Sequence, residues 1–307
     1  MQLNIVNETS KLEVVVLGQP HSMGKRPELE ETYDAKTYET IKNNSYPQEE
    51  DIIHEMTCFE EVLLKHGVKV LRPRILENCN QVFSRDIAFV LEDKIIISNI
   101  IPDRADEQEA YREIFDTIYF QNIYNLPEKA HVEGGDIIPY KDLVFCGVYK
   151  GEDYSRLKTA RTNTYAIDFL RELYPDKTFI DISLKKDDKD PRKGILHLDC
   201  TFMPIGKDKA ILYKDGFLDE KEYHFLVDIF GKSNTFEITE EEMYHMNTNI
   251  FSISPEVVVS EEKFVRLNNF LEEEWNIKVE RIPYHEISKM GGLLRCSTLP
   301  LIRKNEE

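Results

Sequence analysis

The feature that most constrains the fold of this chain is a recurring pair of short apolar segments joined by a charged turn. Three such pairs read as β-hairpins, with their turns at residues 92–94, 139–142 and 204–209. A weaker fourth pair surrounds Ser254 and Pro255. Each hairpin is followed by an amphipathic pattern typical of a helix, over residues 105–120, 164–173, 218–230 and 260–271.

These elements form a repeating unit. Short strands are expected after the last three helices, at residues 178–180, 235–237 and 277–279, and Ser260 is expected to cap the fourth helix. The unit strand–strand–helix–strand recurs at intervals of roughly 50–60 residues, which indicates a solenoid or a radial, propeller-like arrangement. Helices within the unit exclude an ordinary all-β propeller.

The N-terminal part precedes the first hairpin. Residues 11–18 read as a buried strand, and the polar segment 19–46 reads as a long loop of the kind that forms lids or binding loops. Pro47 opens a helix that Gly67 ends, and residues 68–71 read as the next strand. The apolar stripe of this helix comprises Ile52, Met56, Phe59 and Leu63.

Composition limits the classes of function. The 307 residues are 41% hydrophobic, and no composition break marks a linker, so we expect one catalytic domain over residues 1–307. A net charge of −18 disfavours nucleic-acid binding, which needs a basic face, and suits a cationic small molecule. No apolar run is long enough to span a bilayer, so we expect a cytoplasmic protein that does not bind membranes.

Cysteine usage and charge runs add two expectations. The five cysteines are scattered and form no C-x-x-C pair, which argues against a disulfide framework and against a thiolate zinc site. The charged run 185–190 is expected to be a solvated loop. The sequence leaves open whether the protein forms a homo-oligomer.

Residues suited to chemistry stand just before the hairpins. Asp86 precedes the first, Glu133 and Asp136 precede the second, and His197 and Asp199 precede the third. Cys296 has the comparable place in the last repeat, so a radial arrangement would bring all six to one axis. His197 and Asp199 are two residues apart, so on one strand they would face the same side.

Each of these residues also has a structural interpretation. Cys296 alone reads as a buried structural thiol, since free cysteines are mostly buried. Asp86 is also suited to pairing with a basic neighbour, Glu133 to a turn with the glycines after it, and His197 to the core. Together they favour a catalytic site, in which cysteine is the nucleophile and histidine with a carboxylate transfers protons.

The remaining carboxylates indicate the substrate. Two further aspartates exceed what a thiol protease needs, whereas the planar N–H donors of a guanidinium pair bidentately with carboxylates. Arg295, beside Cys296, either tunes the thiol or points away from it.

Five short motifs follow one another along the chain: Phe83-Ser84-Arg85-Asp86, Glu133-Gly134-Gly135-Asp136, Arg161-Thr162-Asn163, His197-Leu198-Asp199, and Gly291-Gly292 followed by Cys296-Ser297-Thr298. In this order they resemble the motifs of the guanidino-modifying enzymes, the pentein or amidinotransferase superfamily, which includes arginine deiminase, dimethylarginine dimethylaminohydrolase and glycine amidinotransferase. The resemblance implies an α/β fold, a five-bladed pseudosymmetric α/β propeller of ββαβ modules, in agreement with the repeat.

The resemblance also implies roles. Cys296 would attack the guanidinium carbon and form a covalent thiouronium adduct, while His197 and Glu133 would transfer protons. Asp86 and Asp199 would clamp the guanidinium nitrogens. Arg161 would hold a substrate carboxylate, and the other expected substrate-binding residues are Asp136 and Arg85. No metal or organic cofactor is implied.

The acceptor decides the reaction. Water gives a hydrolase of the deiminase or dimethylarginine dimethylaminohydrolase type, and an amine gives an amidinotransferase. We favour an arginine-like substrate and hydrolysis, because hydrolysis needs no second organic pocket. Two alternatives of other classes are a non-catalytic binding protein on the same fold and a metal hydrolase that uses His197, Asp199 and Glu133.

Overall fold

The structure is a computed structural model that describes residues 1–304. Within these residues the strands form five three-stranded sheets, and in each one an antiparallel pair is joined by a third strand parallel to the middle one. Four sheets follow the chain order: β3–β4–β5 (Ala88–Leu91, Lys94–Ile97, Ile123–Asn125), β6–β7–β8 (Ile137–Tyr140, Leu143–Gly147, Thr178–Ile182), β9–β10–β11 (Phe202–Ile205, Lys209–Leu212, Thr235–Glu237) and β12–β13–β14 (Phe251–Ser254, Val257–Glu261, Lys278–Ile282).

The fifth sheet joins the two ends of the chain. β15 (Thr298–Arg303) pairs antiparallel with β1 (Leu12–Leu17), which pairs parallel with β2 (Lys69–Leu71). β15 therefore takes the place that the first hairpin strand has in the other sheets. Five sheets of one form are consistent with five strand–strand–helix–strand modules, and the last module is completed by the beginning of the chain.

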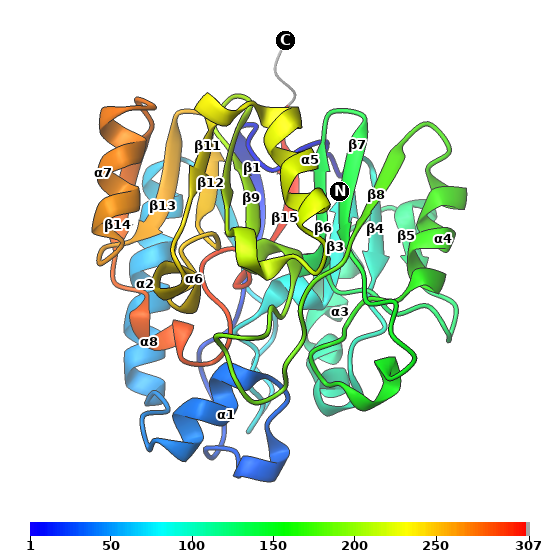
Figure 1. The fold of residues 1–307 in the computed structure, drawn as a ribbon. Helices are drawn as coiled ribbons and strands as arrows, with labels where there is room; N and C mark the ends of the chain where they lie inside the picture. The colour runs from blue at the N-terminus through cyan, green and yellow to red at the C-terminus, as the bar shows by residue number, and fades with distance from the viewer. Residues whose placement is uncertain (305–307) are drawn as a thin grey trace.

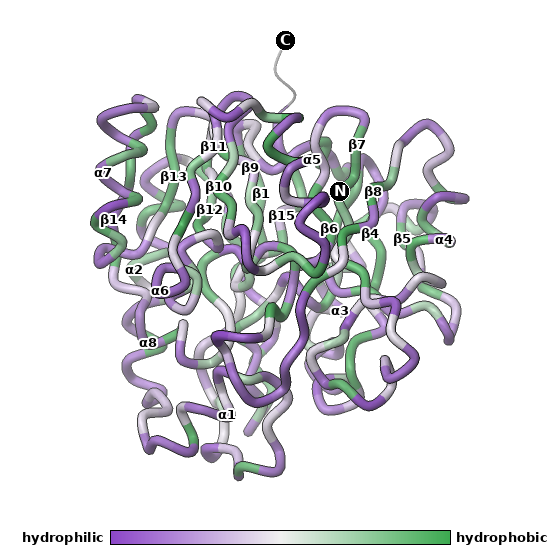
Figure 2. The backbone as a smooth tube through the Cα atoms, viewed as in Figure 1, coloured by the Kyte–Doolittle hydropathy of each residue, from purple (hydrophilic) through white to green (hydrophobic). Residues whose placement is uncertain are grey.

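Helices lie outside the strands, and loops gather at one end of them (Figure 1). Figure 2 shows hydrophobic residues along the strands and hydrophilic residues in many of the loops below them. The predicted stripe of α2 is confirmed, since Ile52, Met56, Phe59 and Leu63 are fully buried. The helices are α1 (Ala35–Lys42), α2 (Glu49–Lys65), α3 (Arg112–Phe115), α4 (Thr164–Leu173), α5 (Glu220–Phe230), α6 (Glu240–Tyr244), α7 (Val265–Glu273) and α8 (His285–Ser288).

The four predicted hairpins are confirmed, but several other expectations are wrong. The segment 19–46 contains α1, because Asp34 caps it by accepting a hydrogen bond from the Thr37 N–H at 2.7 Å. Residues 105–120 contain only four residues of α-helix, and Pro102–Tyr111 form a 3₁₀ helix instead. Ser260 lies in β13, so it does not cap α7.

Two further differences concern the third strand and the charged run. β5 follows the first helical segment, so this module has the third strand that its sequence pattern did not reveal. The run 185–190 is only partly solvated, because the ammonium of Lys186 donates to the carbonyls of Ile195 and Leu196 at 3.0 and 2.7 Å. Among residues 1–304, no helix has both the length and the apolar character needed to cross a membrane.

Candidate active site

Short 3₁₀ turns before the first strands of three modules contain or directly follow most of the predicted site residues. The turns are Ser84–Asp86, Gly134–Asp136 and Leu198–Cys200, and each leads into the first strand of its sheet. His197 therefore precedes a turn that contains Asp199, and the two residues do not alternate along a strand, so that part of the prediction is wrong. The turns still bring the carboxylates, the imidazole and Cys296 together, as the interatomic distances show.

His197 and Glu133 form the centre of the cluster. The Nε2 atom of His197 lies 2.8 Å from Oε2 of Glu133, and both side chains are buried. Burial lowers the pKa of His197, but the carboxylates of Asp86, Glu133 and Asp136 outweigh it and raise that pKa above its usual value. The structure thus favours an imidazolium able to donate a proton.

Arg161 holds the other side of Glu133. Its Nη1 donates to both carboxylate oxygens at 3.0 and 2.8 Å, and its Nη2 donates to the backbone carbonyl of Tyr33 at 2.8 Å. Burial alone would raise the pKa of Glu133, but Arg161, His197 and Arg104 lower it to about 2. Glu133 is ionised, and Arg161 meets this carboxylate where the resemblance implied a substrate carboxylate.

Asp86 faces His197 with one oxygen and Arg104 with the other. Oδ2 accepts from Nη1 of Arg104 at 2.5 Å, and Arg104 also forms two 2.7 Å contacts with Glu107. Oδ1 of Asp86 and Nδ1 of His197 are buried and lie 3.8 Å apart, and neither atom has a hydrogen-bond partner among residues 1–304. Two unpartnered buried polar atoms of this kind indicate a place for a ligand that donates and accepts hydrogen bonds.

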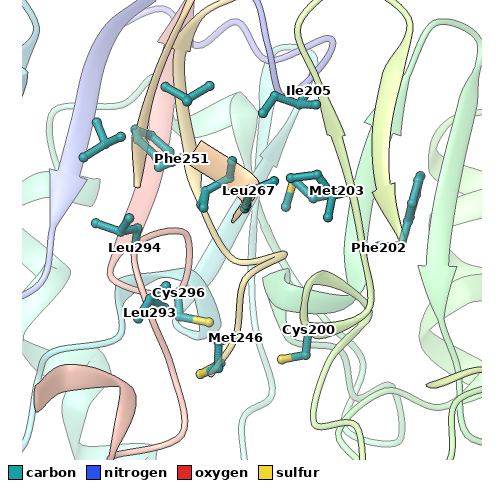
Figure 3. Close-up of a cluster of buried hydrophobic side chains, with 14 of the residues drawn as sticks. Cys200, Phe202, Met203, Ile205, Met246, Phe251, Leu267, Leu293, Leu294 and Cys296 are labelled. Atoms are coloured by element: carbon teal, nitrogen blue, oxygen red, sulfur yellow. The ribbon is translucent and has the colours of Figure 1, made fainter. Parts of the chain in front are cut away.

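Asp199 lies between two thiols and an arginine. Its Oδ2 is 3.8 Å from Sγ of Cys296, its Oδ1 is 3.6 Å from Sγ of Cys200, and Arg295 Nη1 donates to Oδ2 at 2.8 Å. Figure 3 shows the sulfur atoms of Cys296, Cys200 and Met246 near the lower ends of the strands. Burial raises the pKa of Cys296 well above its usual value, and Asp199, Cys200 and Asp86 raise it further.

Asp136 and Arg85 have other partners than the predicted substrate. Asp136 accepts hydrogen bonds from the Thr162 hydroxyl at 2.6 Å and the Leu198 N–H at 2.9 Å, so it fixes the turn that follows His197. Arg85 donates to the Thr298 hydroxyl at 3.3 Å and lies 3.8 Å from a Glu8 oxygen. Both residues therefore hold neighbouring parts of the protein in place around the site.

Glycines allow this close approach. A Cβ atom on Gly135 would lie 2.6 Å from Nδ1 of His197, so any other residue there would displace the imidazole. Gly291 has a φ of +84°, and a Cβ there would lie 2.4 Å from an oxygen of Asp34. The two glycine motifs are therefore explained by the packing of His197 and Asp34.

Several residues of the site were not predicted. Asn249, at the same position before β12, accepts a hydrogen bond from the Cys296 N–H through Oδ1 at 3.1 Å, and the repeat itself could have pointed to it. Tyr33 places its ring 5.9 and 5.8 Å from the guanidinium carbons of Arg104 and Arg161. Neither Arg104 nor Tyr33 belongs to a motif, so no sequence signal identified them.

Two cavities adjoin the segment that carries Tyr33 and Asp34. One, of about 50 Å³, is lined by Asp34, Cys200, Met246 and Gly291 among others. The other, of about 730 Å³, is lined by Tyr33, Arg104 and Glu107 among others. Residues of the segment predicted as a lid or binding loop therefore line both cavities, next to Cys200, which contacts Asp199, and Arg104, which contacts Asp86.

A metal ion is one ligand to consider. Asp86, Glu133 and His197 offer ligand atoms that all lie within 4.8 Å of one another. Asp86 is already ion-paired with Arg104, however, and Glu133 with Arg161. A divalent cation would have to compete with both arginines, so this donor set fits a metal poorly.

Comparisons with known proteins identify the family of the chain. Residues 19–303 match the family described as "N,N dimethylarginine dimethylhydrolase, eukaryotic". An uncharacterised protein, YkgA of Bacillus subtilis, is 29% identical over 306 residues, which cover 96% of this chain and 94% of that protein.

Solved structures share the fold at low identity. SxtG, an amidinotransferase of the saxitoxin pathway of Microseira wollei, is 18% identical with a TM-score of 0.75, over 99% of this chain and 98% of that one. The N-terminal domain of ArgZ, a cyanobacterial arginine dihydrolase, is 16% identical with a TM-score of 0.77, over 95% and 98%. DDAH from Pseudomonas aeruginosa is 16% identical with a TM-score of 0.69, over 95% and 100%.

The family match spans nearly all of the sequence, and the three structures, an amidinotransferase and two hydrolases, share its α/β fold. The chain belongs to the N,N dimethylarginine dimethylhydrolase family, within the guanidino-modifying pentein superfamily.

Proposed function

We propose that the protein is a cysteine-dependent hydrolase of arginine-like guanidino compounds. The observation that carries the proposal is the pair of unpartnered buried atoms, Oδ1 of Asp86 and Nδ1 of His197, in the cluster where Asp199 meets the Cys296 thiol. A planar guanidinium offers N–H donors to both carboxylates and presents its carbon to the sulfur.

The reaction balances without an outside reductant or oxidant. As the guanidinium cation binds, the Cys296 thiol loses its proton to solvent. The sulfur then forms a bond to the guanidinium carbon, and the C–N bond breaks as His197 gives its proton to the leaving amine. Water attacks the thiouronium carbon and gives one proton to His197. The C–S bond breaks as the hydroxyl of the adduct loses its proton and becomes the product carbonyl, and the sulfur takes up a proton again from solvent. Glu133 stays ionised throughout and stabilises the imidazolium.

The other residues have supporting roles in this proposal. Asp86 and Asp199 clamp the guanidinium, and Arg161 orients Glu133 in the free enzyme. The family match favours hydrolysis over amidino transfer. We also propose one domain in which the five modules surround a common axis in an α/β propeller, because residues from successive modules meet in one cluster.

Incubation with arginine, methylarginines and agmatine, followed by assays for citrulline, ornithine, urea and ammonia, tests the proposal. Turnover should depend on Cys296, and Cys296→Ser should reduce it at least ~1000-fold, as loss of a covalent nucleophile does. Cys58→Ser is the matched control, because Cys58 is a free thiol on α2 outside the cluster.

Intact-mass measurement during turnover should detect an adduct that Cys58→Ser forms and Cys296→Ser does not. The absence of both turnover and adduct across the panel would refute the proposal. Activity that survives in Cys296→Ser and disappears with a chelator would instead support the metal hydrolase.

A further inference from the structure

The N-terminal segment supplies a carboxylate to the back of the site. Glu8 lies before the family-matched residues 19–303, and it is only 5% exposed. A tight turn fixes it, since Oδ1 of Asn7 accepts hydrogen bonds from the N–H groups of Thr9 and Ser10 at 3.0 and 2.7 Å. The Ser10 carbonyl of this turn also accepts a hydrogen bond from Nη1 of Arg303 at 2.6 Å.

Arg295 connects this carboxylate to the site. Its Nη2 and Nε atoms contact the two oxygens of Glu8 at 2.7 and 3.3 Å, while its Nη1 donates to Asp199 at 2.8 Å. The carbonyls of Gly134 and Ile137 accept from the same guanidinium at 3.3 and 2.9 Å. Arg295 is thus held between two carboxylates with every arm bonded, and its orientation toward Asp199 is fixed.

Without Glu8, the buried positive charges around it would exceed the negative charges that face them. Glu8 faces three buried arginines, Arg295, Arg85 and Arg303, whereas Asp199 is the other carboxylate bound to Arg295. Burial raises the pKa of Glu8, but the three arginines outweigh this effect and lower it to about 2. Glu8 is therefore ionised and offsets part of the positive charge of these arginines, one of which, Arg295, binds Asp199.

We propose that Glu8 is a positioning residue of this site: by binding Arg295, it fixes how that guanidinium contacts Asp199 and offsets its positive charge, so that Asp199 can also bind a substrate cation. The inference rests on the proposed function, in which Asp199 binds the guanidinium. Without the negative charge of Glu8, the potential at Asp199 becomes more positive. A cationic guanidine then binds less well, and the Cys296 thiolate becomes easier to form.

The charged groups that face Cys296 are Asp199, Asp86 and Cys200, with Tyr284 beside them. Among residues 1–304, none of these groups contacts Glu8. A change at Glu8 therefore affects the thiol through Arg295 and through the electrostatic potential of the Glu8 charge. A role in folding alone would lower stability and leave the titration of the thiol unchanged.

Glu8→Gln tests this by keeping the shape of the side chain and removing its charge. The rate of Cys296 alkylation by iodoacetamide is measured against pH by mass spectrometry, and its midpoint should move down by about one pH unit. For turnover, KM should rise ~10-fold with a smaller change in kcat. Glu8→Asp keeps the charge and should restore the wild-type midpoint.

Arg303→Gln should shift the midpoint of Cys296 alkylation in the opposite direction. This variant also tests the proposal if Glu8→Gln does not fold. It removes a positive charge from the other side of Glu8 and should move the midpoint up. Glu222→Gln is the control, because Glu222 accepts hydrogen bonds from the Ser183 N–H away from the cluster. It should leave the midpoint where it is.

The two proposals fail separately. If wild-type protein turns over no guanidine and no guanidine protects Cys296 from alkylation, the proposed function fails. Unchanged midpoints in both Glu8→Gln and Arg303→Gln, measured on folded protein, overturn the inference about Glu8 even when the wild type is active.

Discussion

Cys296 has surroundings that disfavour its charged form in the free protein. Burial raises its pKa, and the carboxylates of Asp199 and Asp86 raise it further. The same carboxylates are the ones proposed to bind a guanidinium. A cation between them would offset their charge, so the residues that keep the thiol protonated in the empty site allow it to ionise when a substrate is bound.

Asp199→Asn tests the role of this carboxylate at the residue scale. Removing the charge 3.8 Å from Sγ should lower the pKa of Cys296, so alkylation by iodoacetamide at neutral pH should become about tenfold faster. The same variant should lose turnover, because the clamp is incomplete. Faster alkylation with lost turnover separates this role from simple unfolding, and an unchanged alkylation rate would contradict it.

The residues of the site could be predicted from sequence better than their partners. Repeat register brought Asp86, Glu133, His197, Asp199 and Cys296 together, since equivalent turns lead into equivalent strands. It could not show that Arg161 binds Glu133 or that Arg295 binds Glu8, because these pairs join residues far apart in the sequence.

At the scale of elements, the hairpins were predictable because their apolar strands and charged turns are local signals. The structure of residues 105–120 was not predictable, because a 3₁₀ helix there depends on tertiary contacts. In a 3₁₀ helix, side chains three residues apart lie in line. This geometry places Arg104 beside Glu107 while Arg104 reaches Asp86, and helix propensity does not encode such a contact.

Helix α1, in the segment predicted to be a lid or binding loop, gives a prediction at this scale. Asp34→Ala removes its N-cap and should reduce the free energy of unfolding by about 1 kcal/mol. It should also raise hydrogen exchange in residues 35–42 and raise KM, since Asp34 lines the cavity that Cys200 and Gly291 share. The measurements are hydrogen exchange by mass spectrometry and steady-state kinetics.

Asn163→Ala is the matched control for the lid. Asn163 caps α4 by accepting from the Ala166 N–H at 3.1 Å, so its loss should cost a similar free energy of unfolding. Exchange in residues 35–42 should stay at the wild-type rate. Equal effects of both substitutions on that segment would show that α1 is not a separate lid.

At the scale of the whole molecule, the chain closes on itself through the fifth sheet. β1 and β15 come from opposite ends of the sequence, and Arg303 of β15 binds the turn that holds Glu8. The pairing was not predicted, because no local pattern shows which strand completes the last module. Both β1 and the turn that holds Glu8 contact β15, and both precede the residues of the family match.

This closure predicts how stability depends on pH. The pKa of Glu8 is about 2 in the folded protein and near the usual 4.5 when unfolded, so ionised Glu8 stabilises the fold above about pH 4.5. Its contribution, of about 3 kcal/mol at most, should disappear as the pH falls from about 4.5 to about 2.

Urea unfolding of the wild type and Glu8→Gln over this pH range measures the difference. Wild-type stability should fall more steeply with acid than that of Glu8→Gln, and the two should converge near pH 2. Because other carboxylates titrate in both proteins, the difference between the two curves isolates Glu8. Parallel curves would mean that Glu8 is not ionised among the arginines, and the charge balance proposed behind Asp199 would then be wrong.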